Sequence, residues 1–226
     1  MTSHIAIGHT RWATHGVPSD VNAHPHVSQD GKIAIVHNGI IENYVDLKQE
    51  LAEKHRIEFK TETDSEVIAQ LIGVIYAEKK DLLEPVDRMR GAYAIVAIAE
   101  DEPDKMVAVR KDAPLIVGLG KKSNFVASDI PALLKYVKEI YLIENNETVL
   151  VTADQVTIFD EDKNKVDREV FHVTWDVDAA EKEGYEHFML KEIYEQPKGL
   201  SETLGRRLDD TGKINLEGIS LTREDI

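Results

Sequence analysis

The sequence predicts an α+β fold in which two helices near the start are followed by a long series of strands. Apolar residues recur at the helical period in 43–55 and 63–80. From residue 92 onward the pattern changes to short apolar segments separated by Gly, Asp, Asn or Pro, which is typical of strands joined by turns. The segment AYAIVAIAE at 92–100 is apolar on both faces, so we expect a sheet that is covered on both sides. These observations favour antiparallel sheets layered with helices.

Caps and turn residues set the expected ends of the elements. Asn43 is the expected N-cap of the first helix, and Thr63 with Glu66 has the spacing of a capping box at the second. A strand end is expected at 5–8 and a short strand at 33–36. Further helical segments are expected at 82–90, at 131–137, at 187–197 with a stop near Pro197, and at 198–208. The expected later strands are 92–100, 105–110, 114–120, 124–128, 139–143, 147–152 and 155–159.

Composition restricts the class of protein. Of the 226 residues, 42% are hydrophobic and 31% are charged, which are the proportions of a globular protein with a sizeable core. The formal charge of −15 disfavours binding to nucleic acid or to an anionic membrane surface, and no apolar run is long enough to span a bilayer. The first residues carry no signal-peptide pattern, so we expect a cytoplasmic protein. The absence of cysteine excludes disulfides, thiolate zinc sites and a cysteine nucleophile within this sequence.

Polar chemistry is concentrated in residues 8–39, which contain five of the nine histidines and little regular periodicity. We therefore expect an ordered functional loop that supplies part of an active site. The guanidinium group of Arg11 can offer two parallel hydrogen bonds to a carboxylate ligand, with Thr14 and His15 as further donors. Taken alone, Arg11 is explained more simply by a structural pair with an acidic residue.

His24 and His26 form an H-x-H pair, for which a zinc site is one interpretation. Neither an H-E-x-x-H motif, a cysteine pair nor an acidic residue at ligand spacing accompanies them. Hydrogen-bonding roles within the loop or toward a ligand are therefore favoured over metal binding.

Asn38 and Gly39 follow the expected strand at 33–36 and allow two interpretations. Between apolar segments, an Asn-Gly pair usually marks a hairpin turn, and this is the favoured interpretation of the pair alone. Alternatively, the Asn amide and the Gly N–H form a two-donor oxyanion hole, where Gly leaves room for close approach.

Asp64 lies in the first turn of the strongest expected helix. Its carboxylate either interacts favourably with the helix dipole or holds an ammonium group. Together these candidates offer a carboxylate binder, an ammonium binder and an oxyanion hole, which suits an α-amino acid whose side-chain acyl group is attacked. No nucleophile accompanies them, because neither a G-x-S-x-G elbow nor a Ser-His-acid order is apparent.

Motifs along nearly the whole chain resemble the glutaminase domain of the glutamine–fructose-6-phosphate aminotransferases, also called glucosamine-6-phosphate synthases. Other class II glutamine amidotransferases share fewer of these motifs, and the order of several independent ones makes the resemblance specific. The motifs are HTRWATHG (9–16), NAHPH (22–26), HNGIIENY (37–44), TETDSEV (61–67), RGAY (90–93), APLIVGLG (113–120), FVASD (125–129) and KEIYEQP (191–197).

The resemblance implies an N-terminal-nucleophile (Ntn) hydrolase fold, an αββα sandwich of antiparallel sheets. The amidotransferase domain would cover residues 1–208, and 209–226 would be a linker toward an absent sugar isomerase domain. In the family, L-glutamine releases ammonia, which the isomerase domain uses to make glucosamine 6-phosphate from fructose 6-phosphate. The resemblance implies no cofactor and no metal ion.

The resemblance also implies a role for each site residue. Asn38 and Gly39 would form the oxyanion hole, and Asp64 would hold the α-ammonium group of glutamine. Arg11, Thr14 and His15 would bind the carboxylate of glutamine. Trp12 would help to close the loop and to gate the path of ammonia, and His24 would support the site.

One departure from the family is large. The family begins with a cysteine nucleophile and its strands well before the HTRWATHG motif, whereas eight residues precede that motif here. We therefore expect the first strands to be missing and the chain to be inactive alone. Unpaired sheet edges would favour a homodimer. The alternatives are a non-catalytic amino-acid-binding domain of the same fold and a histidine-ligated metal hydrolase.

Overall fold

Strand β3 (Gly91–Ala99) is an interior strand of the larger sheet, and its side chains are mostly buried on both faces. Tyr93, Ile95 and Ala97 pack in one apolar cluster with the helices, whereas Ala94 and Val96 pack in a second cluster on the opposite face. A strand that is apolar on both faces requires a covering layer on each side. The predicted sheet with two covered faces is thus confirmed.

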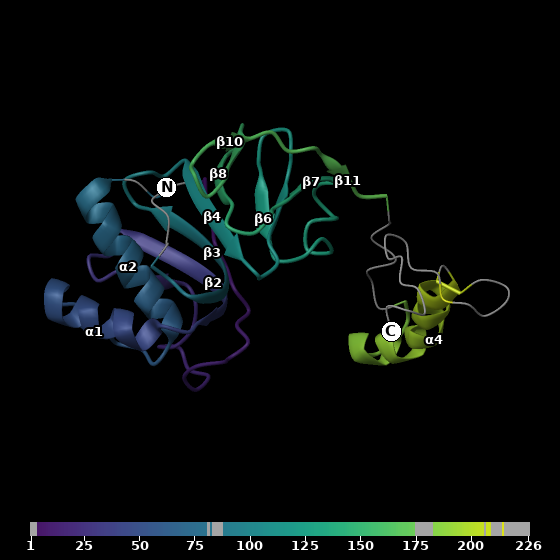
Figure 1. The fold of residues 1–226 in the computed structure, drawn as a ribbon, viewed down its shortest axis with the longest axis horizontal. Helices are drawn as coiled ribbons and strands as arrows, with labels where there is room; N and C mark the ends of the chain where they lie inside the picture. The colour runs from purple at the N-terminus through teal and green to yellow at the C-terminus, as the bar shows by residue number, and fades with distance from the viewer. Residues whose placement is uncertain are drawn as a thin grey trace, which may run out of the picture. The chain divides into compact units, whose positions relative to one another are not determined.

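The computed structural model describes residues 4–80, 82, 88–174, 183–205, 207–208 and 214. The chain divides into two compact units, residues 1–174 and 175–226. In the described residues, the first unit contains both sheets and two helices, and the second contains helix α4 (Phe188–Gly205) (Figure 1). Among the described residues, no helix is long and apolar enough to cross a membrane.

Both sheets of the first unit are antiparallel throughout their described pairings. The larger sheet has the strand order β1 (His26–Val27), β2 (Ile33–Ile41), β3, β4 (Lys105–Lys111), β8 (Thr148–Thr152), β9 (Val156–Phe159) and β10 (Lys165–Val166). The smaller sheet has the order β11 (Phe171–His172), β7 (Glu139–Leu142), β5 (Ile116–Gly118) and β6 (Phe125–Ala127). Every later strand predicted from the sequence is present. The additional strands β1, β10 and β11 have two residues each, too few for an alternating pattern to show.

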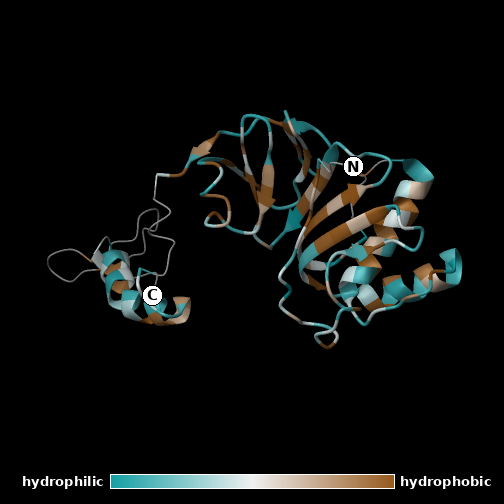
Figure 2. Cartoon of the chain, turned by 180° about the vertical axis from the view of Figure 1, so that it is seen from behind, coloured by the Kyte–Doolittle hydropathy of each residue, from teal (hydrophilic) through white to brown (hydrophobic). Residues whose placement is uncertain are grey.

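Helices α1 (Tyr44–His55) and α2 (Asp64–Lys79) cover one face of the larger sheet, and the strands next to them are mostly hydrophobic, shown in brown (Figure 2). Thr63 is the N-cap of α2, and its Oγ1 accepts a hydrogen bond from the N–H of Glu66 at 3.2 Å. The carboxylate of Glu66 accepts from the N–H groups of Lys60 and Thr61. The predicted cap is confirmed, and Glu66 also fastens the segment that leads into α2.

Asn43 occupies the N-cap position of α1, as predicted, but its side chain makes no capping hydrogen bond. Its amide donates to the carbonyl of Arg88 at 2.9 Å and accepts from the N–H of Arg90 at 2.8 Å. The side chain therefore joins the start of α1 to the segment that enters β3.

Three expected elements differ in the structure. Helix α4 passes through Pro197, so the predicted stop there was wrong. Proline removes one N–H group from the helix ladder, and the bonds on either side can carry the helix past it. Residues 131–137, where one or two helical turns were expected, form hydrogen-bonded turns without a regular helix, and residues 5–8 form no strand.

Two other expectations cannot be compared with the structure. The helix expected at 82–90 lies outside the described residues apart from Leu82 and its last three positions. The linker at 209–226 likewise lies outside them apart from Ile214, which forms a bridge with Leu208.

A substitution at Gly91 tests how closely the backbones of β2 and β3 approach each other. Its φ is +120°, and a Cβ atom there would lie 2.2 Å from the carbonyl oxygen of Ile40. We expect Gly91→Ala to lower the free energy of unfolding by about 3 kcal/mol or more, measured by urea denaturation. Gly31→Ala is the matched control, because Gly31 has a φ of +78° but open space around it. That control should lose only about 1 kcal/mol, and equal losses in the two variants would contradict the packing argument.

Candidate active site

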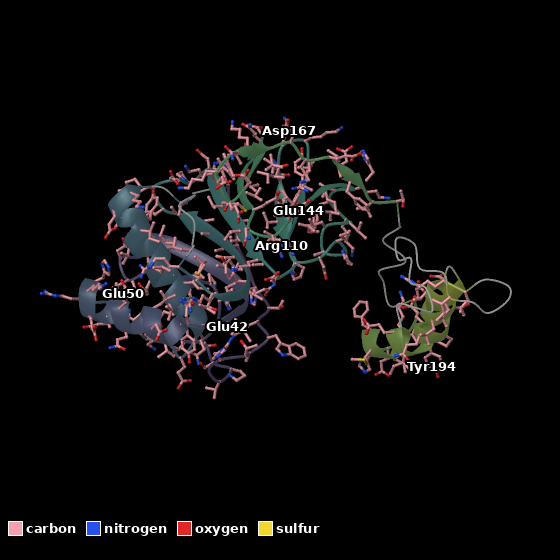
Figure 3. The ribbon with its side chains drawn as sticks, viewed as in Figure 1. Glu42, Glu50, Arg110, Glu144, Asp167 and Tyr194 are labelled. Carbon is pink, nitrogen blue, oxygen red and sulfur yellow. The ribbon has the colours of Figure 1, made fainter. Side chains whose placement is uncertain are left out.

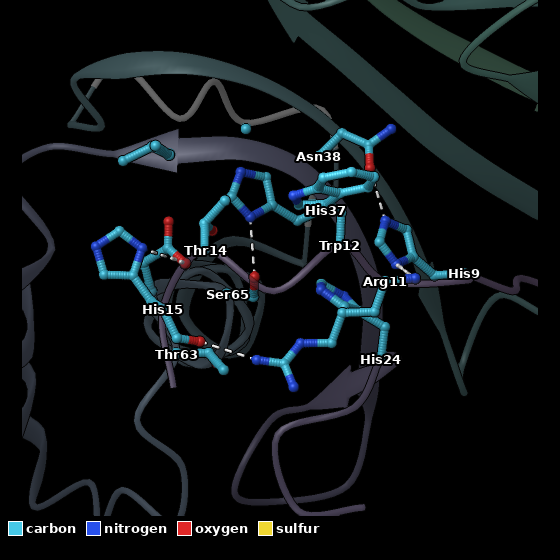
Figure 4. Close-up of a pocket in the computed structure, with 13 residues that line it drawn as sticks. His9, Arg11, Trp12, Thr14, His15, His24, His37, Asn38, Thr63 and Ser65 are labelled. Atoms are coloured by element: carbon cyan, nitrogen blue, oxygen red, sulfur yellow. Dashed lines mark hydrogen bonds and ion pairs between the residues drawn. The ribbon is translucent and has the colours of Figure 1, made fainter. Parts of the chain in front are cut away.

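The candidate site lies where β2 continues beyond its neighbour β1. Strand β1 pairs only with Ala34 and Ile35, so the outer edge of β2 is open from Val36 onward. The first turn of α2 and the loop of residues 9–16 enclose this edge around a pocket of about 260 Å³ (Figure 4). The pocket is lined by His9, Arg11, Trp12, Thr14, His15, His24, His37, Asn38, Gly39, Ile40, Thr63, Asp64 and Ser65. The structure thus brings all eight residues predicted for the site into one pocket, whereas their roles remain predictions.

Asn38 and Gly39 lie within a continuous strand and form no hairpin turn. They pair with Ala94 and Tyr93 across the β2–β3 ladder, so the hairpin interpretation was wrong. Gly39 has a φ of +119°, and a Cβ atom there would lie 2.0 Å from the carbonyl oxygen of Ala92. Glycine is therefore required here by the contact with β3.

The N–H group of Gly39 turns toward the open edge of β2. Backbone N–H groups alternate between the two sides of a strand. The N–H of Glu42 bonds to Arg90 on the β3 side, whereas that of Ile41 bonds to Asp64 on the other side. Gly39 lies two residues before Ile41, so its N–H points to the same side of the strand as that of Ile41 and faces the pocket.

Asp64 is 3% exposed and places its two carboxylate oxygens in different surroundings. Oδ2 accepts a hydrogen bond from the N–H of Ile41 at 2.9 Å. Oδ1 faces the ring of His15, whose Nδ1 is 4.0 Å away. That distance is too long for a hydrogen bond, so Oδ1 can receive a cationic group from a ligand.

Arg11 holds the loop that covers the pocket. Its guanidinium donates to the carbonyls of His15 at 2.9 Å, Gly16 at 3.1 Å and Val17 at 3.2 Å. The guanidinium has five N–H groups, so donors remain for a carboxylate ligand. In the described part of the chain no ion pair of Arg11 with an acidic residue is found, and its structural partners are carbonyl groups.

Trp12 and His15 differ in exposure within this loop, since His15 is half-buried. The indole of Trp12 is 91% exposed. The ring of His15 packs edge-on against Tyr44 of α1, with ring centroids 5.3 Å apart. The loop therefore has an anchored side and a free aromatic side chain that could close over a ligand.

Three histidine rings, those of His9, His24 and His26, form a cluster beside Asn38. The ring centroids of His9 and His24 are 4.2 Å apart with a tilted arrangement, and those of His24 and His26 are 4.8 Å apart and edge-on. Nε2 of His9 lies 2.6 Å from Oδ1 of Asn38, and Nε2 of His26 lies 3.2 Å from Oγ1 of Thr63. The histidine cluster thus connects the open strand edge to the N-cap of α2.

Burial keeps the inner imidazoles uncharged. Burial, followed by the neighbouring His9, lowers the pKa of His24 to about 3. Burial also lowers the pKa of His37 to about 4, against the opposing effect of Asp64. Burial lowers the pKa of His26 as well. These rings therefore act as neutral hydrogen-bonding groups at physiological pH.

Metal binding finds no support in the described histidines. The described residues contain no group of three or more His, Cys, Asp or Glu side chains that could hold an ion. Nδ1 of His37 lies 2.9 Å from Oγ of Ser65, whereas Nε2 of His37 and Nδ1 of His24 are buried without a hydrogen-bond partner in the described residues.

Several pocket residues were not among the predicted site residues. They are His9, His37, Ile40, Thr63 and Ser65. Each of them lies inside a sequence motif that also holds a predicted residue, so proximity within those motifs was the available signal. Asn22, which does not line the pocket, was also missed. Its amide donates to Val17 at 3.0 Å and accepts from the N–H of Glu62 at 3.2 Å, which ties the loop to the start of α2.

The lowered pKa of His37 predicts a loss of stability in acid. The unfolded chain takes up the proton near pH 6.5, whereas the folded chain takes it up only near pH 4. Stability is therefore fully present above the unfolded pKa and falls with pH across this window, by at most about 1.4 kcal/mol per pH unit. In denaturation measured as a function of pH, His37→Gln should show a shallower fall than the wild type. Parallel curves would show that His37 is not buried as a neutral ring.

Comparison with known proteins adds independent findings. A family described as a glutamine amidotransferase domain matches residues 1–189. The chain is 58% identical over 224 residues to the glutamine–fructose-6-phosphate aminotransferase [isomerizing] of Clostridium perfringens, covering 97% of this chain and 36% of the relative. It is 51% identical over 202 residues to the protein of the same name from Aquifex aeolicus, covering 88% of this chain and 34% of the relative. The chain thus spans about a third of the length of these curated relatives.

A solved structure also resembles the chain. It is the glutamine phosphoribosylpyrophosphate amidotransferase of B. subtilis complexed with ADP and GMP, with a TM-score of 0.55 and 24% identity. The alignment covers 70% of this chain and 35% of that chain. At this level of identity the likeness concerns the fold alone.

Proposed function

Because the chain belongs to the glutamine amidotransferase domain family, we propose that its pocket binds L-glutamine and presents the side-chain carboxamide for attack. The antiparallel two-sheet sandwich is the Ntn amidotransferase fold that the sequence predicted. The observation that carries the proposal is the arrangement around one pocket. A buried carboxylate, a guanidinium and a pair of amide donors line the same cavity.

The charged groups of the pocket match the two charges of a free amino acid. Oδ1 of Asp64 takes the α-ammonium group, since Oδ2 is already engaged by the N–H of Ile41. Arg11, with Thr14 and His15 beside it, binds the α-carboxylate. It uses the N–H groups of its guanidinium that do not donate to the loop carbonyls. Trp12 closes over the ligand from its exposed position.

Asn38 and Gly39 take the carbonyl oxygen of the glutamine side chain. Two convergent N–H donors stabilise the negative charge that develops on this oxygen during attack. Loss of one such donor typically costs about 10²–10³ in turnover rate. Two observations support this role: the alternation of N–H groups along β2, which turns that of Gly39 toward the pocket, and the close contact of Gly39 with Ala92.

The names of the relatives support a proposal for the reaction of the whole protein. We infer that ammonia released from glutamine serves a glutamine–fructose-6-phosphate aminotransferase reaction, which makes glucosamine 6-phosphate with a sugar isomerase domain. These 226 residues contain no cysteine, so a cysteine nucleophile would come from outside them. We also infer a cytoplasmic homodimer.

Helix α4 supports association with another domain or subunit. Tyr194 of α4 is labelled in Figure 3 and is 64% exposed. Other large apolar side chains on the same helix are also exposed, namely Phe188, Met189, Ile193, Leu200 and Leu204. Apolar surface of this kind is typical of contact sites. We assign residues 1–208 to the amidotransferase domain and 209–226 to a linker.

A second candidate function is amino-acid binding without catalysis. The absence of cysteine from the sequence favours it, because the pocket can hold glutamine without cleaving it. The two candidates share the ligand and differ in whether ammonia is released when a nucleophile is supplied.

Asp64→Asn tests the ammonium contact. Asparagine keeps an acceptor for the N–H of Ile41 but removes the charge, so we expect glutamine affinity to fall about tenfold or more in calorimetry. Asp46→Asn is the matched control, since Asp46 is an exposed residue in the first turn of α1. Affinity that responds equally to both substitutions would contradict the assignment of Asp64.

The 226-residue chain should release no ammonia from glutamine above the buffer rate, because it has no cysteine nucleophile. A coupled ammonia assay checks this expectation. Release that Asn38→Ala abolishes would show that the chain contains an unrecognised nucleophile.

A further inference from the structure

We propose that His9 is a positioning residue that fixes the Asn38 carboxamide with its NH₂ group facing away from the His9 ring and toward the ligand. This inference rests on the proposed function of Asn38 as a donor to the glutamine carbonyl. It adds a residue to which the sequence assigned no role.

The protonation of His9 is determined by a backbone group. The N–H of Arg11 donates to Nδ1 of His9 at 2.8 Å. A backbone N–H can only donate, so this ring nitrogen carries no proton. A neutral imidazole has a single N–H, which must then be on Nε2.

The tautomer of His9 in turn determines the orientation of Asn38. Nε2 lies 2.6 Å from the Asn38 side chain, and its N–H requires an acceptor there. The amide oxygen of Asn38 therefore faces His9, and the amide nitrogen faces away from it (Figure 4). A flipped amide would set two N–H groups against each other and leave both without an acceptor. Thus the backbone of Arg11 specifies which way a donor on β2 points.

Neighbouring rings and the backbone of Arg11 hold the His9 ring in the position from which it orients Asn38. Its ring lies against that of His24, with centroids 4.2 Å apart, and His24 lies against His26. Arg11 has a φ of +52°, a conformation that non-glycine residues rarely adopt. This turn of the backbone presents its N–H to the ring, and the guanidinium of the same residue is tied to the carbonyls of its own loop.

Asn38 lies between two cavities, so the orientation of its amide determines which atom it presents to a ligand. Its side chain lines the 260 Å³ pocket and also a neighbouring cavity of about 370 Å³. The second cavity is bounded by residues of both sheets, including Val96 and Val126, and His9 lines both cavities as well. An unconstrained amide could present either its oxygen or its nitrogen to a ligand. An oxygen in that place would repel the glutamine carbonyl.

Two substitutions of His9 distinguish the effect of its hydrogen bond to Asn38 from the effect of its packing. His9→Gln can place an amide N–H near the position of Nε2, whereas His9→Leu fills space without donating. We expect His9→Leu to weaken glutamine binding about tenfold, as for loss of one oriented donor, and His9→Gln to restore it to within about threefold. In the wild type above the ordinary histidine pKa, ¹⁵N spectra should show a protonated Nε2 and an unprotonated Nδ1 on His9. Equal affinity in all three proteins, equal losses in both variants, or a proton on Nδ1 would overturn the proposal.

A double-mutant cycle tests whether His9 acts through Asn38. His9→Leu should cause no further loss of glutamine affinity in the Asn38→Ala background, and an additive loss would overturn the proposal. The cycle also separates this proposal from the proposed function. If Asn38→Ala alone leaves affinity unchanged, the donor role of Asn38 fails, whereas the ¹⁵N signature of His9 still reports on the tautomer that the N–H of Arg11 imposes.

Discussion

The site depends on one hydrogen bond, from the N–H of Ile41 to Oδ2 of Asp64. It joins the open edge of β2 to the first turn of α2, so that Gly39 and Asp64 keep a fixed separation. The bond also divides the carboxylate, with one oxygen committed to the fold and the other facing the pocket. A buried carboxylate is costly unless it is paired or hydrogen-bonded. Here a backbone donor and the N-terminal end of the helix stabilise it, and the charge remains accessible to a ligand.

The histidines form a neutral scaffold around this anchor. His24, with a pKa lowered to about 3, and His37, with a pKa lowered to about 4, carry no charge at physiological pH. Neutral imidazole suits the position because each ring has one donor and one acceptor, which specify the orientation of their neighbours. His9 is the clearest case, because its Nδ1 accepts from the N–H of Arg11 and its Nε2 donates to Oδ1 of Asn38.

The sequence was sufficient to predict which residues meet in one pocket, and two of these candidates lie at the ends of elements with clear periodicity. Asn38 follows a short apolar strand and Asp64 begins the strongest helix, so a correct list of elements already places both near one edge. The continuation of β2 through Gly39 was not predictable locally, because it depends on pairing with β3, which is distant in the sequence. Likewise, the carbonyl partners of Arg11 depend on the path of a loop that has no periodicity. Pro197 shows the converse, where a local stop signal was overridden by helical residues on both sides.

A crystal structure of the chain with L-glutamine tests the central claim most directly, because the claim concerns how the amino acid is oriented. The account predicts the α-ammonium group within about 3 Å of Oδ1 of Asp64. It also predicts the side-chain carbonyl oxygen between Nδ2 of Asn38 and the N–H of Gly39. Glutamine bound in the reverse orientation, with its carboxamide against Asp64, or bound outside this pocket, would contradict it.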